Sequence, residues 1–166
     1  MTDIYAFLAG HGIPFERVDH PPVFTCEQAE RLVPPLPGAE TKNLLVRDRH
    51  GRRHFLVVVG YDKTVDLKAL GDLLGVSKLG MASAERLGRV LGIEPGSVSL
   101  LAIVNDAEGL VEVLLDKAVW AAEALKCHPL VNTSTLSIRR SDIEKIIKRT
   151  GHRFTVLNVP SAGNSR

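Results

Sequence analysis

Cysteine is scarce in this 166-residue sequence, and its two residues, Cys26 and Cys127, lie far apart and form no CxxC pair. This spacing argues against a disulfide framework and a zinc knuckle. No run approaches the roughly 18 consecutive apolar residues of a membrane helix, and the first residues lack the basic and apolar regions of a secretory signal. We therefore expect a cytoplasmic protein with no metal, no cofactor and no membrane association.

Several motifs of common enzymes are also absent. The sequence has no GxxxxGK[ST], GxSxG or HExxH pattern, which disfavours nucleotide hydrolysis, α/β-hydrolase chemistry and zincin chemistry. Aromatic residues make up only 5% of the chain, so stacking on nucleic-acid bases is expected to be limited. The net charge of +2 does not by itself indicate a nucleic-acid binder.

Basic residues nevertheless gather in two places. The first group is Arg47, Arg49, Arg52 and Arg53, and the second is Arg139, Arg140, Lys145, Lys148, Arg149 and Arg153. Such clusters either contact phosphates or form an ordinary solvated turn and helix face. Charge alone leaves both interpretations open.

The apolar content, 45% of the residues with a mean hydropathy of +0.06, is sufficient for a full core. We expect one domain over residues 1–159 and a flexible tail over 160–166. Apolar spacing and capping residues predict helices over residues 2–12, 25–34, 66–75, 83–92, 118–126 and 141–151. Strands are predicted over 13–18, 43–47, 54–59, 98–104, 110–115 and 154–157, with one hairpin joining 43–47 to 54–59 and another joining 98–104 to 110–115. Without regular strand–helix alternation, this pattern predicts an α+β fold with a largely antiparallel or mixed sheet.

Polar residues stand in two apolar or stiff surroundings. Lys42 and Asn43 follow a proline-rich loop, where a lysine can hold a phosphate or an oxyanion and an amide can donate and accept hydrogen bonds. His128 precedes a proline and can position a substrate or relay a proton near neutral pH. Asn132 and Thr133 either line a small polar pocket or form a turn. A solvated lysine and a structural histidine are the ordinary alternatives.

An ordered set of short motifs runs through the whole chain. The motifs are Asp19-His20-Pro21-Pro22-Val23-Phe24-Thr25, Pro37-Gly38, Thr41-Lys42-Asn43-Leu44, Pro95-Gly96-Ser97-Val98, Asn105-Asp106, Leu115-Asp116 and His128-Pro129-Leu130-Val131-Asn132. In this order and spacing they closely resemble the YbaK/prolyl-tRNA synthetase-associated domain family over about residues 3–158. Within the family, the chain is most similar to the free-standing PrdX/ProXp-type deacylases, which hydrolyse alanyl-tRNA(Pro).

The resemblance implies a fold and a set of site residues. The fold is α+β with a central, mostly antiparallel, barrel-like sheet flanked by helices. The activity is cleavage of the ester between a wrong amino acid and the terminal ribose of tRNA, with Lys42, Asn43 and His128 as catalytic residues. The resemblance gives Gly96, Ser97 and Val98 of the glycine loop as substrate-binding residues, and we expect Asn132 and Thr133 to bind substrate beside them. In the GxxxP-type loop of the family this chain has Leu100 where the family has proline, which leaves the amino-acid preference open.

The resemblance also suggests the partners. Arg47, Arg49, Arg52 and Arg53, or the C-terminal basic cluster, are candidates for contacts with the tRNA acceptor stem beside the CCA end. Prolyl-tRNA synthetase is a possible second partner. Because an aminoacyl ester is already activated, orienting water and stabilising an oxyanion are sufficient, and no covalent nucleophile is needed. Two alternatives remain: a deacylase for another small residue such as serine, threonine, cysteine or a non-protein amino acid, and a non-catalytic module that binds tRNA or a synthetase.

Overall fold

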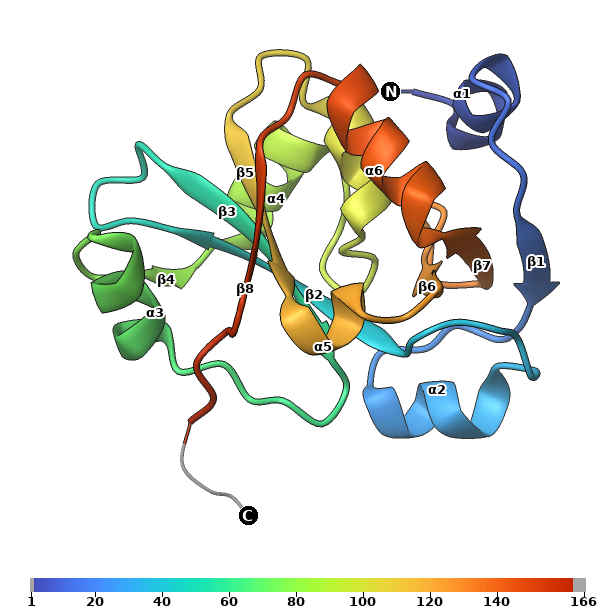
Figure 1. Cartoon of the computed structure of the whole chain (residues 1–166), viewed down its shortest axis with the longest axis horizontal. Helices are drawn as coiled ribbons and strands as arrows, with labels where there is room; N and C mark the ends of the chain where they lie inside the picture. The colour runs from blue at the N-terminus through green and yellow to red at the C-terminus, as the bar shows by residue number, and fades with distance from the viewer. Residues whose placement is uncertain (1, 163–166) are drawn as a thin grey trace.

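The computed structural model describes residues 2–162 (Figure 1). The helices are α1 (Ile4–Gly10), α2 (Cys26–Leu32), α3 (Leu67–Leu74), α4 (Ala84–Leu91), α5 (Lys117–Trp120) and α6 (Arg140–Arg149), with a 3-10 helix, η1 (Leu100–Asn105). The strands are β1 (Glu16–Asp19), β2 (Thr41–Arg47), β3 (His54–Gly60), β4 (Gly80–Met81), β5 (Val111–Asp116), β6 (Ala124–Cys127), β7 (Ser134–Arg139) and β8 (Phe154–Leu157). The predicted α+β class, with helices flanking largely antiparallel and mixed sheets, is confirmed.

The larger sheet has the strand order β4-β2-β3-β5-β8. The predicted hairpin of β2 and β3 is present, with a register that runs from Thr41 opposite Gly60 to Arg47 opposite His54. Its turn is held by Asp48, whose Oδ1 accepts the backbone N–H groups of Arg52 and Arg53. β5 then pairs in parallel with β3, and β8 pairs in parallel with β5, so this sheet is mixed.

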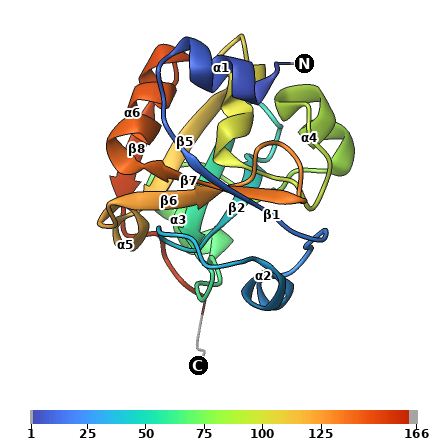
Figure 2. The same ribbon diagram turned by 90° about the vertical axis from the view of Figure 1, so that its right-hand side faces the viewer.

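The smaller sheet has the order β1-β7-β6 and is antiparallel throughout. Figure 2 shows its three strands side by side in front of the larger sheet. Ala39 joins the two sheets just before β2 begins: its N–H donates to Ala124 (2.8 Å), and its carbonyl accepts the N–H of Lys126 (3.1 Å). The start of β2 is therefore fixed at the corner where the sheets meet.

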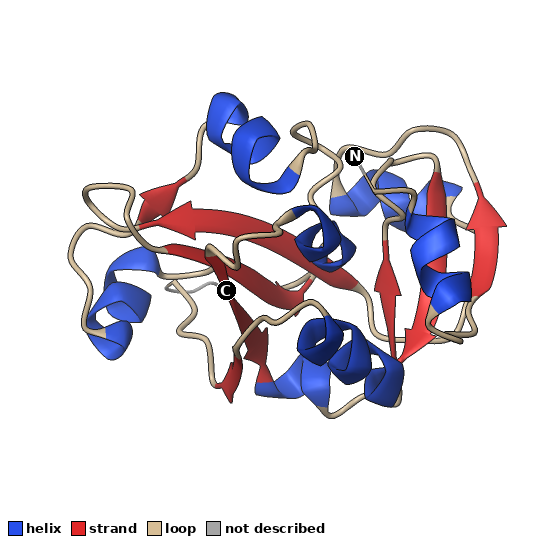
Figure 3. Cartoon of the chain, turned by 90° about the horizontal axis from the view of Figure 1, so that it is seen from above, coloured by secondary structure: helices blue, strands red, loops and turns tan. Residues whose placement is uncertain are grey.

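Apolar side chains pack against both faces of the larger sheet, and helices lie on both sides of it (Figure 3). Side chains of a strand point alternately to its two faces. Leu45 and Leu56 accordingly belong to the core cluster shared with the smaller sheet and α6, whereas Val46 and Phe55 pack with Leu70 of α3 in a second cluster. Burial of β3 on both faces makes the β2–β3 hairpin a rigid base for whatever its ends carry.

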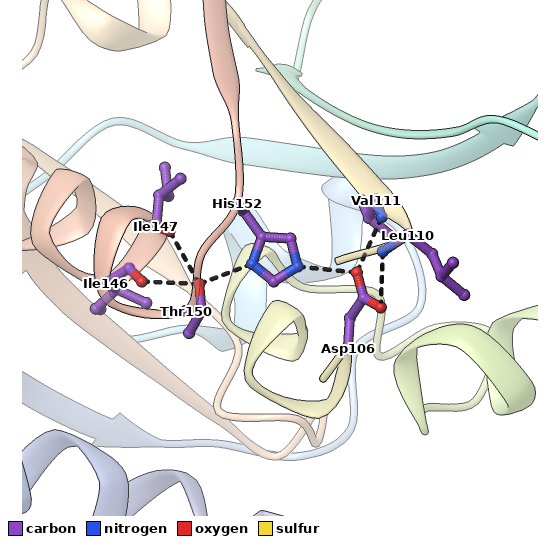
Figure 4. A network of polar contacts seen from close by, with 7 residues as sticks. All are labelled: Asp106, Leu110, Val111, Ile146, Ile147, Thr150 and His152. Carbon is purple, nitrogen blue, oxygen red and sulfur yellow. Dashed lines mark hydrogen bonds and ion pairs between the residues drawn. The ribbon is translucent and has the colours of Figure 1, made fainter. Parts of the chain in front are cut away.

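A buried polar network fixes the region between η1 and α6 (Figure 4). Nε2 of His152 lies 2.8 Å from Oδ2 of Asp106, and Nδ1 of His152 lies 2.8 Å from the hydroxyl oxygen of Thr150. The Asp106 carboxylate also accepts the backbone N–H groups of Leu110 (3.0 Å) and Val111 (2.9 Å). The network joins the end of η1, the start of β5 and the turn after α6.

The predicted hairpin of residues 98–104 with 110–115 is wrong. Residues 100–105 form η1, and β5 pairs with β3. Ser99 begins this helix, because its hydroxyl oxygen accepts the N–H of Leu101 (3.2 Å). A short apolar run has no periodicity that separates a buried strand from a buried helix, so this cap decides the conformation.

Other boundaries also differ from the expectation. The predicted helix over 118–126 is the short helix α5 followed by strand β6, and the predicted strand over 13–18 begins later, at Glu16. α6 begins at Arg140, without a side-chain cap from Ser141. The expected tail does not begin loosely at Pro160, because the Pro160 carbonyl accepts the N–H of Asp66 (2.9 Å) and the Ala162 N–H donates to Thr64 (2.7 Å). Residues 163–166 of that tail lie outside the described residues.

Candidate active site

A pocket of about 170 Å³ lies at the corner where the start of β2 meets the smaller sheet and α2. Five of the residues proposed from the sequence line it: Lys42, Asn43, Gly96, Val98 and His128. The other lining residues are Val23, Phe24, Thr25, Cys26, Ala29, Thr41 and Tyr61. Segments that are far apart in the sequence therefore form one small cavity.

Lys42 and Asn43 lie near the start of β2, where they pair with Val59 and Val58 of β3. None of the ion pairs within residues 2–162 includes Lys42, so its ammonium group is available to a ligand. Oδ1 of Asn43 is buried and has no hydrogen-bond partner in the described part of the chain. A buried acceptor of this kind is unfavourable unless a donor reaches it, and a ligand in the pocket can supply one.

His128 follows β6 directly and is held from two sides. Its Nδ1–H donates to the carbonyl of Ser134 (3.3 Å), while its own carbonyl accepts the hydroxyl of Ser99 (2.6 Å). Burial lowers the pKa of His128 below its ordinary value of 6.5, against a smaller opposing effect of the Ser134 contact. The ring is therefore neutral at pH 7, and Nε2 is an unprotonated hydrogen-bond acceptor.

The glycine loop forms a second wall of the pocket. Gly96 has a φ of +91°, a conformation that residues with a Cβ rarely adopt. A Cβ at this position would also lie 3.1 Å from Cδ1 of Phe24. Leu100, where the family pattern has proline, is the first residue of η1, a position that has no intrahelical acceptor for its N–H and that tolerates proline. Leucine and proline at position 100 thus fit the same backbone path.

Asn132 and Thr133 do not line the pocket, and neither does Ser97. Asn132 instead pairs with Val23, accepting its N–H (3.2 Å) and donating Nδ2–H to its carbonyl (3.0 Å). The Thr133 carbonyl accepts the N–H of His20 (3.0 Å). These residues therefore support the pocket wall from behind.

The four arginines lie at the opposite end of the β2–β3 hairpin from the pocket. Arg47 is five residues after Lys42 along β2, a distance of about 16 Å at about 3.3 Å per residue. Arg53 is bound to Glu112 through two contacts, Nε to Oε2 (3.1 Å) and Nη2 to Oε1 (3.0 Å). Arg49 and Arg52 are exposed, and no side-chain partner is found for either within residues 2–162.

The sequence did not single out seven of the lining residues as part of the site, and Phe24, Cys26, Thr41 and Tyr61 are among them. Burial raises the pKa of Tyr61, and so does the neighbouring carboxylate of Glu40, so its phenol stays protonated. Burial also raises the pKa of the Cys26 thiol, against the opposing charge of Lys42. Thr41 adjoins Lys42 and offered a signal by position, whereas only the fold brings Tyr61, at the end of β3, to the pocket.

Comparison with known proteins gives a family model that matches residues 20–146, described as an aminoacyl-tRNA editing domain. The chain is 36% identical over 147 residues to the prolyl-tRNA editing protein ProX of Acetoanaerobium sticklandii, which covers 89% of this chain and 90% of that protein. It is 32% identical over 158 residues to prolyl-tRNA synthetase associated domain-containing protein 1 of Danio rerio, covering 94% of this chain and 85% of that protein.

Solved structures share the fold at low sequence identity. Hypothetical protein APE2540 superposes with a TM-score of 0.73 at 18% identity, over 95% of this chain and 99% of that one. A protein provisionally named as a trans-editing enzyme for prolyl tRNA synthetase gives 0.67 at 16% identity, over 98% and 99%. Within residues 2–162, no group of three or more His, Cys, Asp or Glu side chains is arranged to hold a metal ion, and no helix is long and apolar enough to cross a membrane.

Proposed function

Because the chain belongs to the aminoacyl-tRNA editing domain family, we propose that it is a trans-editing deacylase that hydrolyses the ester of mischarged tRNA, with Ala-tRNA(Pro) as its substrate. The observation that carries the proposal concerns two groups in one small pocket. Within residues 2–162, Lys42 has no ion-pair partner and the buried Asn43 Oδ1 has no hydrogen-bond donor. Such a pocket suits a small charged ester. Its place of action is the cytoplasm, where aminoacyl-tRNA is used.

The chemistry needs no covalent nucleophile, since the ester is activated and water is the attacking group. Lys42 binds the phosphate of the terminal nucleotide or the ester oxygen, where its charge stabilises the developing oxyanion. Asn43 Oδ1 accepts a hydrogen bond from the substrate ammonium group or the attacking water. Backbone groups of residues 96–98 orient the ester.

His128 acts as an acceptor in this scheme. Because its Nδ1–H is committed to Ser134, the unprotonated Nε2 receives a hydrogen bond from the aminoacyl end or from the terminal ribose. The free ribose hydroxyl of the substrate assists proton transfer. His128 is thus a positioning group whose neutral form is the working one.

Discrimination between amino acids follows from size. A synthetase site built for proline cannot reject the smaller alanine strongly by binding energy alone. A second pocket that admits alanine and excludes proline corrects this error. The volume of about 170 Å³, below the roughly 300 Å³ at which ordinary ligand sites begin, agrees with a small aminoacyl group.

The tRNA body extends from the pocket toward the turn between β2 and β3, named the arginine turn because it carries Arg49 and Arg52. Of the four arginines, Arg49 and Arg52 are the exposed ones that have no side-chain partner among the described residues, and we assign them the contacts with acceptor-stem phosphates. Arg53, held by Glu112, contributes less. Prolyl-tRNA synthetase is a further partner, since it produces the mischarged substrate.

The test is release of labelled amino acid from proline tRNA charged separately with alanine, serine, cysteine or proline. Wild type is compared with Lys42→Ala and with Lys68→Ala, a control that removes an exposed lysine of α3. Rapid loss of alanine alone, abolished by Lys42→Ala and retained by Lys68→Ala, is the expected result.

The other outcomes separate the alternatives. Release of serine or cysteine in place of alanine keeps the chemistry and changes the substrate. A module that only binds tRNA slows spontaneous hydrolysis of every ester, and that result would overturn the proposal. Full activity of a folded Lys42→Ala protein would contradict the role given to this lysine.

A further inference from the structure

We propose that Phe24 is the stacking platform for the terminal base of the tRNA, so that the base lies on this ring while the aminoacyl ester enters the pocket. The inference rests on the proposed function, because it takes the ester of a tRNA end as the ligand. It adds a base-binding position to a site whose other residues contact phosphate, ester and amino acid.

The size of the pocket places the base outside it. A cavity of about 170 Å³ is below the roughly 300 Å³ of sites that hold whole ligands, so it admits the aminoacyl group and not the nucleoside as well. The ester and the base are attached to the same ribose. When the ester is inside, the base therefore lies at the mouth, within one sugar of the lining residues.

Phe24 is the aromatic group exposed at that mouth. It lines the pocket, yet 68% of its surface is open to solvent, the largest exposed fraction among the exposed large hydrophobic residues of the described chain. An aromatic ring left in water beside a polar pocket is unfavourable by itself. A nucleobase has an apolar face of matching size, and when the base stacks on the Phe24 ring, the contacting face of each is removed from water.

The backbone that carries the ring is held in place before any ligand arrives. Val23, directly before it, is buried and pairs with Asn132 through two hydrogen bonds. The N–H of Phe24 itself donates to Oε1 of Gln28 (2.8 Å), and Thr25 caps α2. The backbone at this position is therefore fixed from both sides.

Gly96 supports the ring from below. A Cβ on Gly96 would lie 3.1 Å from Cδ1 and 3.4 Å from Cε1 of Phe24, so the absence of a side chain lets the ring rest against the glycine loop. One side of the ring thus contacts the loop that orients the ester, and the exposed side remains for the base. The same contact relates the position of the base to that of the ester.

The experiment measures the coupling between this ring and the base. Two proline-tRNA acceptor minihelices are compared in equilibrium binding, one ending in adenosine and one whose last ribose carries no base. Each is measured with wild type, Phe24→Leu, Phe24→Trp and Phe15→Leu. Phe15 is the matched control, because it is an exposed phenylalanine that packs against Tyr5 away from the pocket.

Wild type is expected to bind the adenosine-ended minihelix about 5- to 150-fold more tightly than the abasic one, the range that stacking of one base provides. Phe24→Leu reduces this ratio to near 1, whereas Phe24→Trp and Phe15→Leu retain it. Circular dichroism confirms that Phe24→Leu is folded, which the exposure of the side chain leads us to expect.

Equal binding of the two minihelices by wild type, or an unchanged ratio in Phe24→Leu, would overturn the proposal. So would the absence of measurable binding to either minihelix. The deacylase assignment is tested separately, by the release of labelled amino acid. That assay is independent of the ratio of the two minihelix affinities.

Discussion

At the scale of single residues, Cys26 offers a chemical probe of the pocket. Because burial raises the pKa of its thiol, little thiolate is present at pH 7, and alkylation by iodoacetamide accelerates about tenfold per pH unit below that pKa. We expect alkylation to block the pocket and to abolish deacylation with the same pH-dependent rate. Cys127 is fully buried with its pKa raised to about 12, so it stays unmodified.

The control is Cys26→Ser, measured against its own untreated activity. This variant is expected to lose none of that activity on treatment, and mass spectrometry of the wild type should find one modified cysteine. Inactivation of Cys26→Ser at the wild-type rate would show that the reagent acts elsewhere.

A second residue-scale prediction concerns His54, which is buried in β3 with Nε2 2.9 Å from Nη1 of Arg86. Burial, and to a smaller extent the charge of Arg86, lowers its pKa below 6.5. Between 6.5 and that lower value, the unfolded chain binds a proton that the folded protein does not, so the free energy of unfolding decreases as the pH falls through this window and levels off below it.

Urea unfolding between pH 8 and pH 5 tests the sign. Wild type should lose stability on acidification, and His54→Gln should lose less, since the titrating group is gone. The remaining dependence includes His128, whose pKa is lowered in the same direction. An equally steep loss in His54→Gln would contradict the assignment to this histidine.

At the scale of secondary-structure elements, local signals predicted the β2–β3 hairpin but not η1. The hairpin has a turn whose Asp48 satisfies two N–H groups, so sequence and structure agree. Residues 98–104 form a short apolar run that fits a strand as well as a helix, yet Ser99 uses its hydroxyl both to begin η1 and to hold the carbonyl of His128. That second contact spans 29 residues of chain and has no local signature.

Ser99 therefore joins the glycine loop, residues 96–100, to the segment after β6 that carries His128. Ser99→Ala tests this link. The half-buried carbonyl of His128 loses its donor and the buried N–H of Leu101 loses its acceptor, which costs about 1–3 kcal/mol of stability. We also expect kcat for deacylation to fall, because the two walls of the pocket lose their relative position. Thermal unfolding and single-turnover kinetics measure the two effects.

Ser83→Ala is the comparison for that experiment. It removes the N-cap of α4, whose hydroxyl accepts the N–H of Arg86 (3.2 Å), and so costs about 0.5–2 kcal/mol at a site that does not line the pocket. Its kcat should stay at the wild-type value. A similar fall in kcat for both variants would mean that lost stability, and not the link, explains the effect of Ser99→Ala.

At the scale of the whole molecule, the α+β class followed from the mixture of helices and hairpins, but the sheet order did not. β3, β5 and β8 pair in parallel, and parallel partners need long connections that a local pattern does not encode. The same limit applies to the site. The sequence proposed Lys42, Asn43 and His128, which line the pocket, whereas Tyr61 and the open ring of Phe24 became visible only when the pocket was assembled.

The separation of pocket and arginine turn along one rigid hairpin leads to the last prediction. If Arg49 and Arg52 contact acceptor-stem phosphates, log Kd for tRNA depends on log salt concentration, and each substitution to alanine reduces the slope by about 0.7–1. Arg53→Ala, on the same turn, should change the slope less, because Glu112 already holds its guanidinium. Filter binding between about 50 and 200 mM salt measures all three. Equal changes for the three variants would mean that the general charge of the turn attracts the tRNA, without assigned contacts.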